Sequence, residues 1–167
     1  CPNCHSALWV SFFFDGTGNH AEKHFPNSHS NVAALRDAHL DKEEDGVFRR
    51  YYEGLGMPFE FKDRYEKIPI WGPGGTITGY RENKGYEEKD ESALGKGFAN
   101  GITERLEKAT FDLIQIAEDY RSRLRVDEIN VAAFGFSRGA TEARAFVNWI
   151  SRISGIKSKG KNLTYHD

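Results

Sequence analysis

The first third of the chain contains one short, mostly apolar run, residues 8–14. The turn-forming segment 15–19 follows it directly, which predicts a buried strand ending in a glycine-rich turn. Residues 47–52, rich in aromatic residues, resemble a second strand. Between these two segments, Asn31 is expected to cap a short helix that ends near His39.

The second half of the chain has a clearer periodicity. Apolar residues recur at helical spacing over residues 101–123, which predicts a long amphipathic helix. A turn at residues 126–127 and a strand at residues 128–134 are expected next, and a further helix after Ser137, ending near Ile150. The order helix, strand, tight turn, helix predicts an α/β fold with a mostly parallel sheet flanked by helices.

The length of 167 residues suits one domain with a sizeable core. We expect an N-terminal tail over residues 1–7 and the N-terminal part of a single domain over residues 8–167. Prolines and glycines interrupt residues 57–99 repeatedly, which predicts an irregular insertion over one end of the sheet.

Charge and hydropathy argue against nucleic-acid binding and against a membrane-spanning helix. The net charge is −2 and the two signs are mixed, so the chain lacks the basic excess that would attract nucleic acid. No apolar run approaches the roughly 20 residues that a membrane-spanning helix needs.

Both cysteines lie at the start of the chain. Cys1, Cys4 and His5 match the attachment pattern of c-type haem. A haem also needs an enclosing apolar pocket and usually a second axial ligand. A zinc site needs four ligands, and His20 and His24 are only loosely placed to complete one. We therefore expect a cysteine-bearing tail, with no cofactor and no metal.

The candidate chemistry lies between the predicted strand 128–134 and the helix that follows it. Gly135, Ser137 and Gly139 match G-x-S-x-G, the nucleophile elbow of α/β-hydrolases. Ser137 would sit at the strained apex of the turn, and the backbone N–H of Arg138 would point at a developing oxyanion. The alternative is a tight turn with an incidental serine.

A second oxyanion donor must come from another loop at the same edge of the sheet. The turn after the first strand is the best candidate, with the backbone N–H groups of Gly16 and Thr17 as donors. Composition alone favours the alternative, a simple turn built from turn-forming residues.

Two sequence blocks together resemble a bacterial family. Residues 13–19 and 135–140 are similar to the family of α/β-hydrolase domains that includes the type VI secretion phospholipase effectors of the Tle1 type. Residues 31–35 and 51–56 fall in the family's order. Residues 145–149 resemble the secreted effectors more closely than the wider family. The resemblance covers nearly the whole chain.

The resemblance implies a serine-dependent lipid ester hydrolase of the phospholipase A type. Ser137 would form an acyl-enzyme with glycerophospholipids of the target-cell membrane. A type VI system would deliver the protein to the periplasm of the target cell, with a secretion spike protein and a cognate immunity protein as partners. The alternatives are a carboxylesterase or thioesterase for soluble substrates, and a non-catalytic binding module with the same fold.

The rest of a catalytic triad is harder to place. In this fold the order is serine, acid, histidine. After Ser137 the only acids are Glu142 and Asp167, and the only histidine is His166. His166 and Asp167 stand in the wrong order at the chain end, and Glu142 is expected to be an ordinary surface residue. The upstream histidines match no triad position of the family: His20, His24, His29 and His39. The resemblance places the acid and the histidine beyond residue 167, so both triad and sheet are expected to be incomplete in this chain.

Overall fold

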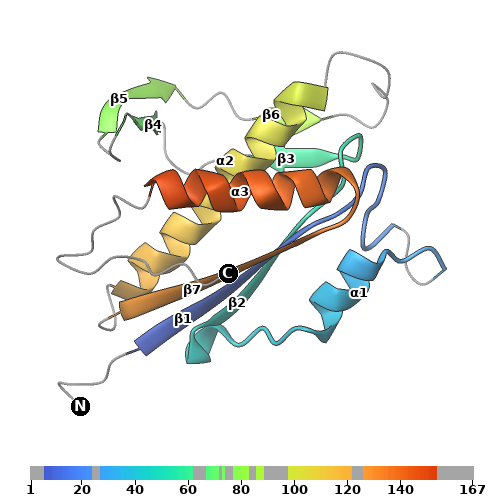
Figure 1. Ribbon diagram of the computed structural model, residues 1–167, viewed down its shortest axis with the longest axis horizontal. Coiled ribbons are helices and arrows are strands. Elements are labelled where there is room, and N and C mark those ends of the chain that lie inside the picture. Colours follow the sequence, from blue (N-terminus) through green and yellow to red (C-terminus); the bar gives the residue numbers. More distant parts are fainter. Residues whose placement is uncertain are drawn as a thin grey trace.

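The computed structural model describes eight segments of the chain: residues 6–23, 27–61, 67–71, 73, 77–82, 86–88, 98–121 and 126–153. Figure 1 shows the elements, which in chain order are β1 (Ser6–Phe14), α1 (Asn31–Ala38), the 3-10 turn η1 (Glu43–Asp45), β2 (Val47–Tyr52), β3 (Phe59–Phe61), β4 (Lys67–Trp71), β5 (Ile77–Glu82), β6 (Tyr86–Glu88), α2 (Phe98–Arg121), β7 (Val126–Gly135) and α3 (Arg138–Ile153). The predicted α/β order is therefore confirmed.

A three-stranded parallel sheet forms the centre of the described fold, in the order β2-β1-β7. Phe14, the last residue of β1, pairs with Tyr52 of β2 and with Gly135 of β7. The carboxyl ends of all three strands therefore meet at one edge of the sheet, which is where open α/β sheets bind their ligands.

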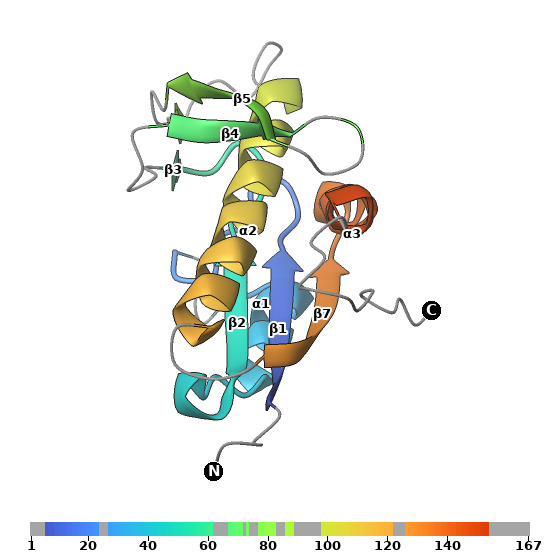
Figure 2. The same cartoon turned by 90° about the vertical axis from the view of Figure 1, so that its left-hand side faces the viewer.

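Helices cover both faces of this sheet. Figures 1 and 2 show α1 on one face and α2 with α3 on the other. Side chains of β1 alternate accordingly: the rings of Phe12 and Phe14 lie 4.6 and 5.6 Å from the ring of Phe146 on α3, whereas the Phe13 ring lies 4.9 Å from His39, next to α1. Among the described helices, none combines the length and apolarity needed to cross a membrane.

The described residues between β2 and α2 include four short strands that the sequence does not predict. β3 pairs with β6 and β4 pairs with β5, both antiparallel. In the view of Figure 2, β4 and β5 lie above the three strands of the parallel sheet. The four short strands have three to six residues each, too few for periodicity to separate them from loop.

Several boundaries differ from the expectation. Ser30, not Asn31, caps α1, because Ser30 Oγ accepts a hydrogen bond from Ala33 N at 3.0 Å. Residues 126–127 are not a turn but the start of β7, where Val126 pairs with Ser6. β1 also begins at Ser6, within the segment expected to be a tail. Strand β2 lies at the predicted residues 47–52, and helices α2 and α3 lie close to where the apolar periodicity predicts them.

Candidate active site

Ser137 stands between the last residue of β7 and the first residue of α3. Its φ is 54°, and among the described residues it is the only non-glycine residue with a positive φ. A side chain in this left-handed region costs about 1–3 kcal/mol, and such strain concentrates at functional sites. The residue as a whole is exposed.

Gly135 and Gly139 flank Ser137 where three backbone segments touch. A Cβ atom on Gly135 would overlap the carbonyl group of Gly139. A Cβ atom on Gly139 would overlap the carbonyl oxygens of Phe14 and Asp15. Only glycine therefore allows the end of β7, the start of α3 and the end of β1 to approach so closely. A nucleophile elbow requires this close approach of strand and helix.

The glycine-rich loop after β1, residues 15–19, lies directly beside the elbow. Phe136 N donates a hydrogen bond to Phe14 O at 3.2 Å. The Phe136 ring covers Gly16, since a Cβ atom on Gly16 would lie only 2.7 Å from Phe136 Cδ1. The ring remains 54% exposed, so an aromatic surface stands open beside Ser137.

Asp15 organises this loop from inside the protein. Its carboxylate is 1% exposed and accepts hydrogen bonds from Gly16 N at 2.7 Å and from Asn19 Nδ2 at 3.1 Å through Oδ1. Through Oδ2 it accepts from Ser30 Oγ at 2.5 Å and Tyr51 OH at 2.7 Å. Burial and the neighbouring Asp15 carboxylate hold the pKa of Tyr51 well above its usual range, so Tyr51 remains a donor. Asp15 thus joins the loop to α1 and β2.

These contacts distinguish the two backbone N–H groups, those of Gly16 and Thr17, that the sequence suggests as oxyanion donors. The Gly16 N–H is occupied by Asp15 Oδ1, and the Gly18 N–H donates to Leu55 O at 3.0 Å. The Thr17 N–H makes no hydrogen bond within the described part of the chain. Of Gly16 and Thr17, only Thr17 therefore has an N–H group that a substrate oxygen can use without displacing a protein contact.

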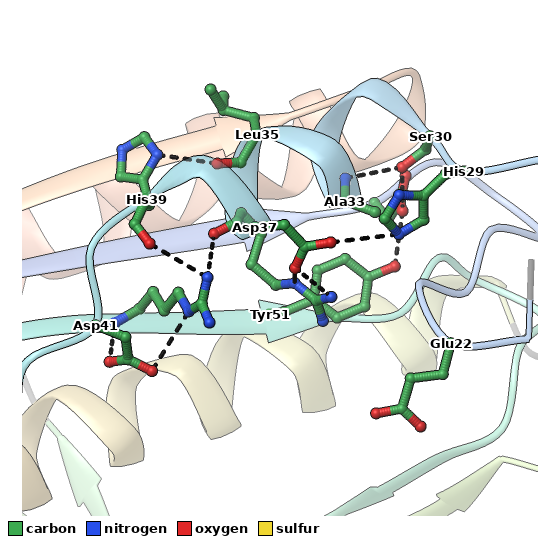
Figure 3. Close-up of polar contacts among 12 residues, drawn as sticks. Glu22, His29, Ser30, Ala33, Leu35, Asp37, His39, Asp41 and Tyr51 are labelled. Atoms are coloured by element: carbon green, nitrogen blue, oxygen red, sulfur yellow. Dashed lines mark hydrogen bonds and ion pairs between the residues drawn. The ribbon is translucent and has the colours of Figure 1, made fainter. Parts of the chain in front are cut away.

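Two of the histidines contact α1. Nε2 of His29 lies 3.7 Å from Asp37 Oδ2, and Nδ1 of His39 lies 3.0 Å from Leu35 O (Figure 3). Within the residues that the structure describes, Ser137 Oγ makes no hydrogen bond to a histidine. Neither residue therefore makes a hydrogen bond to Ser137 in the described part of the chain.

The structure describes two of the other triad candidates, His20 and Glu142. His20 Nδ1 accepts hydrogen bonds from the backbone N–H groups of Glu22 and Lys23. Glu142 is not a surface residue: it is 0% exposed, because it stands one helical turn before the buried Phe146 on the inner face of α3. Three candidates lie outside the described residues: His24, His166 and Asp167.

In the described segments, no group of three or more His, Cys, Asp or Glu side chains could hold a metal ion. The N-terminal cysteine pattern, Cys1 to His5, lies outside the described residues. At the start of α3, the described site offers an exposed serine with a positive φ.

A model of a known protein family matches a stretch of the chain that includes both the loop 15–19 and residues 135–139. The family model described as "T6SS, Phospholipase effector Tle1-like, catalytic domain" matches residues 10–166. Comparisons with curated proteins and with solved structures gave no significant match. The family resemblance carried by residues 13–19 and 135–140 is confirmed. The chain belongs to the Tle1-like phospholipase effectors of the type VI secretion system, and residues 10–166 are catalytic-domain sequence of that family.

Proposed function

We propose that this protein hydrolyses acyl esters of glycerophospholipids, as a phospholipase A, through an acyl-enzyme on Ser137. Membership of a phospholipase effector family supports the substrate class. The observation that carries the proposal is the positive φ of Ser137 at a strand–helix junction where positions 135 and 139 have space only for glycine. A serine held in this way presents its hydroxyl group clear of the sheet.

In the first half of the reaction, Ser137 Oγ attacks the acyl carbonyl carbon while its proton passes to a histidine base. Two backbone N–H groups would hold the resulting oxyanion, those of Arg138 at the first turn of α3 and of Thr17 in the loop. The partial positive charge at the N-terminus of α3 would strengthen the first. Gly16, whose N–H is occupied by Asp15, supports the loop instead.

In the second half, the tetrahedral intermediate collapses, the ester C–O bond breaks, and the protonated histidine gives its proton to the departing lysophospholipid oxygen. Water then attacks the acyl-enzyme, which releases a fatty acid and restores Ser137. We propose that the base and its orienting acid come from sequence beyond residue 167, in the order serine, acid, histidine that this fold uses.

The site of action follows from the same proposal. Type VI effectors are secreted into target cells. We propose that this one acts from the periplasm on target-cell membranes, with a spike protein for its delivery and a cognate immunity protein that restrains it.

The test uses the full-length native protein with vesicles of phosphatidylethanolamine and phosphatidylglycerol. We expect the wild type to release fatty acid and lysophospholipid, and Ser137→Ala to release neither. A matched control is Ser151→Ala on the exposed part of α3, which should keep full activity. Cleavage of a soluble short-chain ester but not of vesicles would favour a carboxylesterase. No cleavage of either substrate would favour a binding module.

A further inference from the structure

Arg105 is a fully buried cation on α2, 0% exposed. Its guanidinium group donates to backbone carbonyl oxygens: Nε to Glu53 O at 2.8 Å, Nη1 to Gly101 O at 3.1 Å and Nη2 to Gly54 O at 3.3 Å. Its Cζ atom lies 4.4 Å from the centre of the Phe59 ring. Most of these contacts are therefore made to the turn that follows β2.

Burying a guanidinium group is costly unless its donors are satisfied. An apolar residue would fill the same space without that cost. We therefore infer that Arg105 is present because its guanidinium group binds backbone carbonyl oxygens. The planar fork of arginine suits this task, because it can reach several oxygens at fixed angles. Here Nη2 also lies 3.5 Å from Met57 O, so both ends of the turn, residues 53–57, contact one side chain.

Residues 53–57 bind the glycine-rich loop, residues 15–19, through backbone hydrogen bonds. Gly54 N donates to Asn19 O and Gly18 N donates to Leu55 O, each at 3.0 Å. The two backbones approach so closely that a Cβ atom on Gly54 would overlap Gly16 O. The position of residues 16–19, and with it the direction of the Thr17 N–H, therefore depends on the position of the turn.

We propose that Arg105 is a positioning residue for the oxyanion donors: it fixes the turn 53–57, and the turn fixes the loop that presents the Thr17 N–H. The inference rests on the proposed function of that loop. A donor must lie about 2.7–3.1 Å from the oxyanion, and removing one donor lowers kcat by roughly 100- to 1,000-fold. Loosening a donor should cost less than removing it, so a loss of about 10- to 100-fold in kcat is expected.

The experiment compares Arg105→Met with wild type in the full-length protein. Oxyanion donors act on the transition state, so kcat should fall by about 10- to 100-fold while KM changes by less than about twofold. Labelling of Ser137 by a fluorophosphonate should slow by a similar factor. Hydrogen exchange at the Gly18 and Gly54 amides, which donate across the loop–turn contact, should become faster.

The matched control is Leu113→Ala, which also removes a buried side chain from α2 but packs in the apolar core. It should lower the melting temperature without changing kcat or exchange in residues 15–19. Equal kcat in Arg105→Met and wild type would overturn the proposal, and so would an equal loss of kcat in Leu113→Ala. If Arg105→Met does not fold, Arg105→Lys takes its place, because it keeps the charge but lacks the planar fork.

A failure of the proposed function gives a different result. The wild type would then take no label at Ser137, although exchange at Gly18 and Gly54 would still show whether Arg105 holds the loop. Unchanged exchange in a folded Arg105 variant would overturn the inference whatever the activity of the wild type.

Discussion

Gly139 lies so close to Phe14 that a Cβ atom on the glycine would overlap the phenylalanine carbonyl oxygen. This contact joins the first turn of α3 to the last residue of β1. It brings the elbow and the glycine-rich loop, more than 100 residues apart in sequence, to the same edge of the sheet. The candidate site is therefore built from backbone contacts that tolerate no added atoms.

Gly139→Ala tests this close contact. The added methyl group has no space, so we expect a loss of at least about 1–3 kcal/mol in unfolding free energy, together with loss of activity. Gly79→Ala is the control, because a Cβ atom there meets only Ile70 Cδ1 at 3.8 Å, an ordinary contact. Urea unfolding measures both variants. Equal stability of the two would contradict the structure at the elbow.

Ser137→Gly tests the strain at the nucleophile. Glycine occupies the left-handed region without the cost that a side chain brings, so the variant should be more stable by about 1 kcal/mol although it is inactive. Ser151→Gly, on the exposed part of helix α3, should instead lose about 0.5 kcal/mol. A destabilised Ser137→Gly in urea unfolding would show that Ser137 is not strained.

Asp15→Asn tests the centre of the loop. One carboxylate oxygen becomes an NH₂ group that faces a donor, so at least one buried group loses its partner, at about 1–3 kcal/mol. Activity should fall as well, since the loop carries the proposed Thr17 donor. Asp41→Asn is the control: it weakens an exposed contact to Arg49, with little expected effect. Similar unfolding midpoints for the two variants would count against the role of Asp15.

The raised pKa values of two adjacent tyrosines, Tyr51 and Tyr52, predict how the stability of the fold changes at high pH. Burial is the largest cause that raises the pKa of Tyr51 and of Tyr52, and the nearby carboxylates of Asp15 and Asp112 raise them further. In the unfolded chain, tyrosine ionises near a pKa of about 10. The folded protein keeps these protons, so their stabilisation is fully present below about pH 10 and is lost as the pH rises further.

Urea midpoints measured between pH 8 and 11 test this dependence. The decline above about pH 10 should be shallower in Tyr51→Phe, which has one fewer group to ionise in the unfolded state. An identical pH dependence in wild type and Tyr51→Phe would show that the Tyr51 pKa is not raised by folding.

The sequence predicts the parts of this fold that depend on local patterns. Helices α2 and α3 follow from apolar periodicity, and the strand–turn–helix junction at Ser137 lies where the spacing of Gly135, Ser137 and Gly139 predicts it. The short strands β3 to β6 escape prediction because a few residues carry no measurable period. Local signals are thus sufficient for the main elements.

Long-range contacts account for what the sequence does not predict. Asp15 is an acid directly after an apolar strand, a weak signal for a buried role, and its partner Tyr51 is 36 residues away. Arg105 sits in a helix with many charged residues, and nothing local separates it from an exposed arginine until its contact with Glu53 O is known. Glu142 could have been found, because helical spacing places it on the same face as Phe146.

The central claim is that Ser137 is an activated nucleophile, and fluorophosphonate labelling followed by intact-mass measurement tests it most directly. With the full-length native protein we predict one added probe mass in the wild type and in Ser151→Ala, and none in Ser137→Ala. Peptide mapping should place the adduct on Ser137. A folded, full-length wild type that takes no label, or a label that persists in Ser137→Ala, would contradict the account.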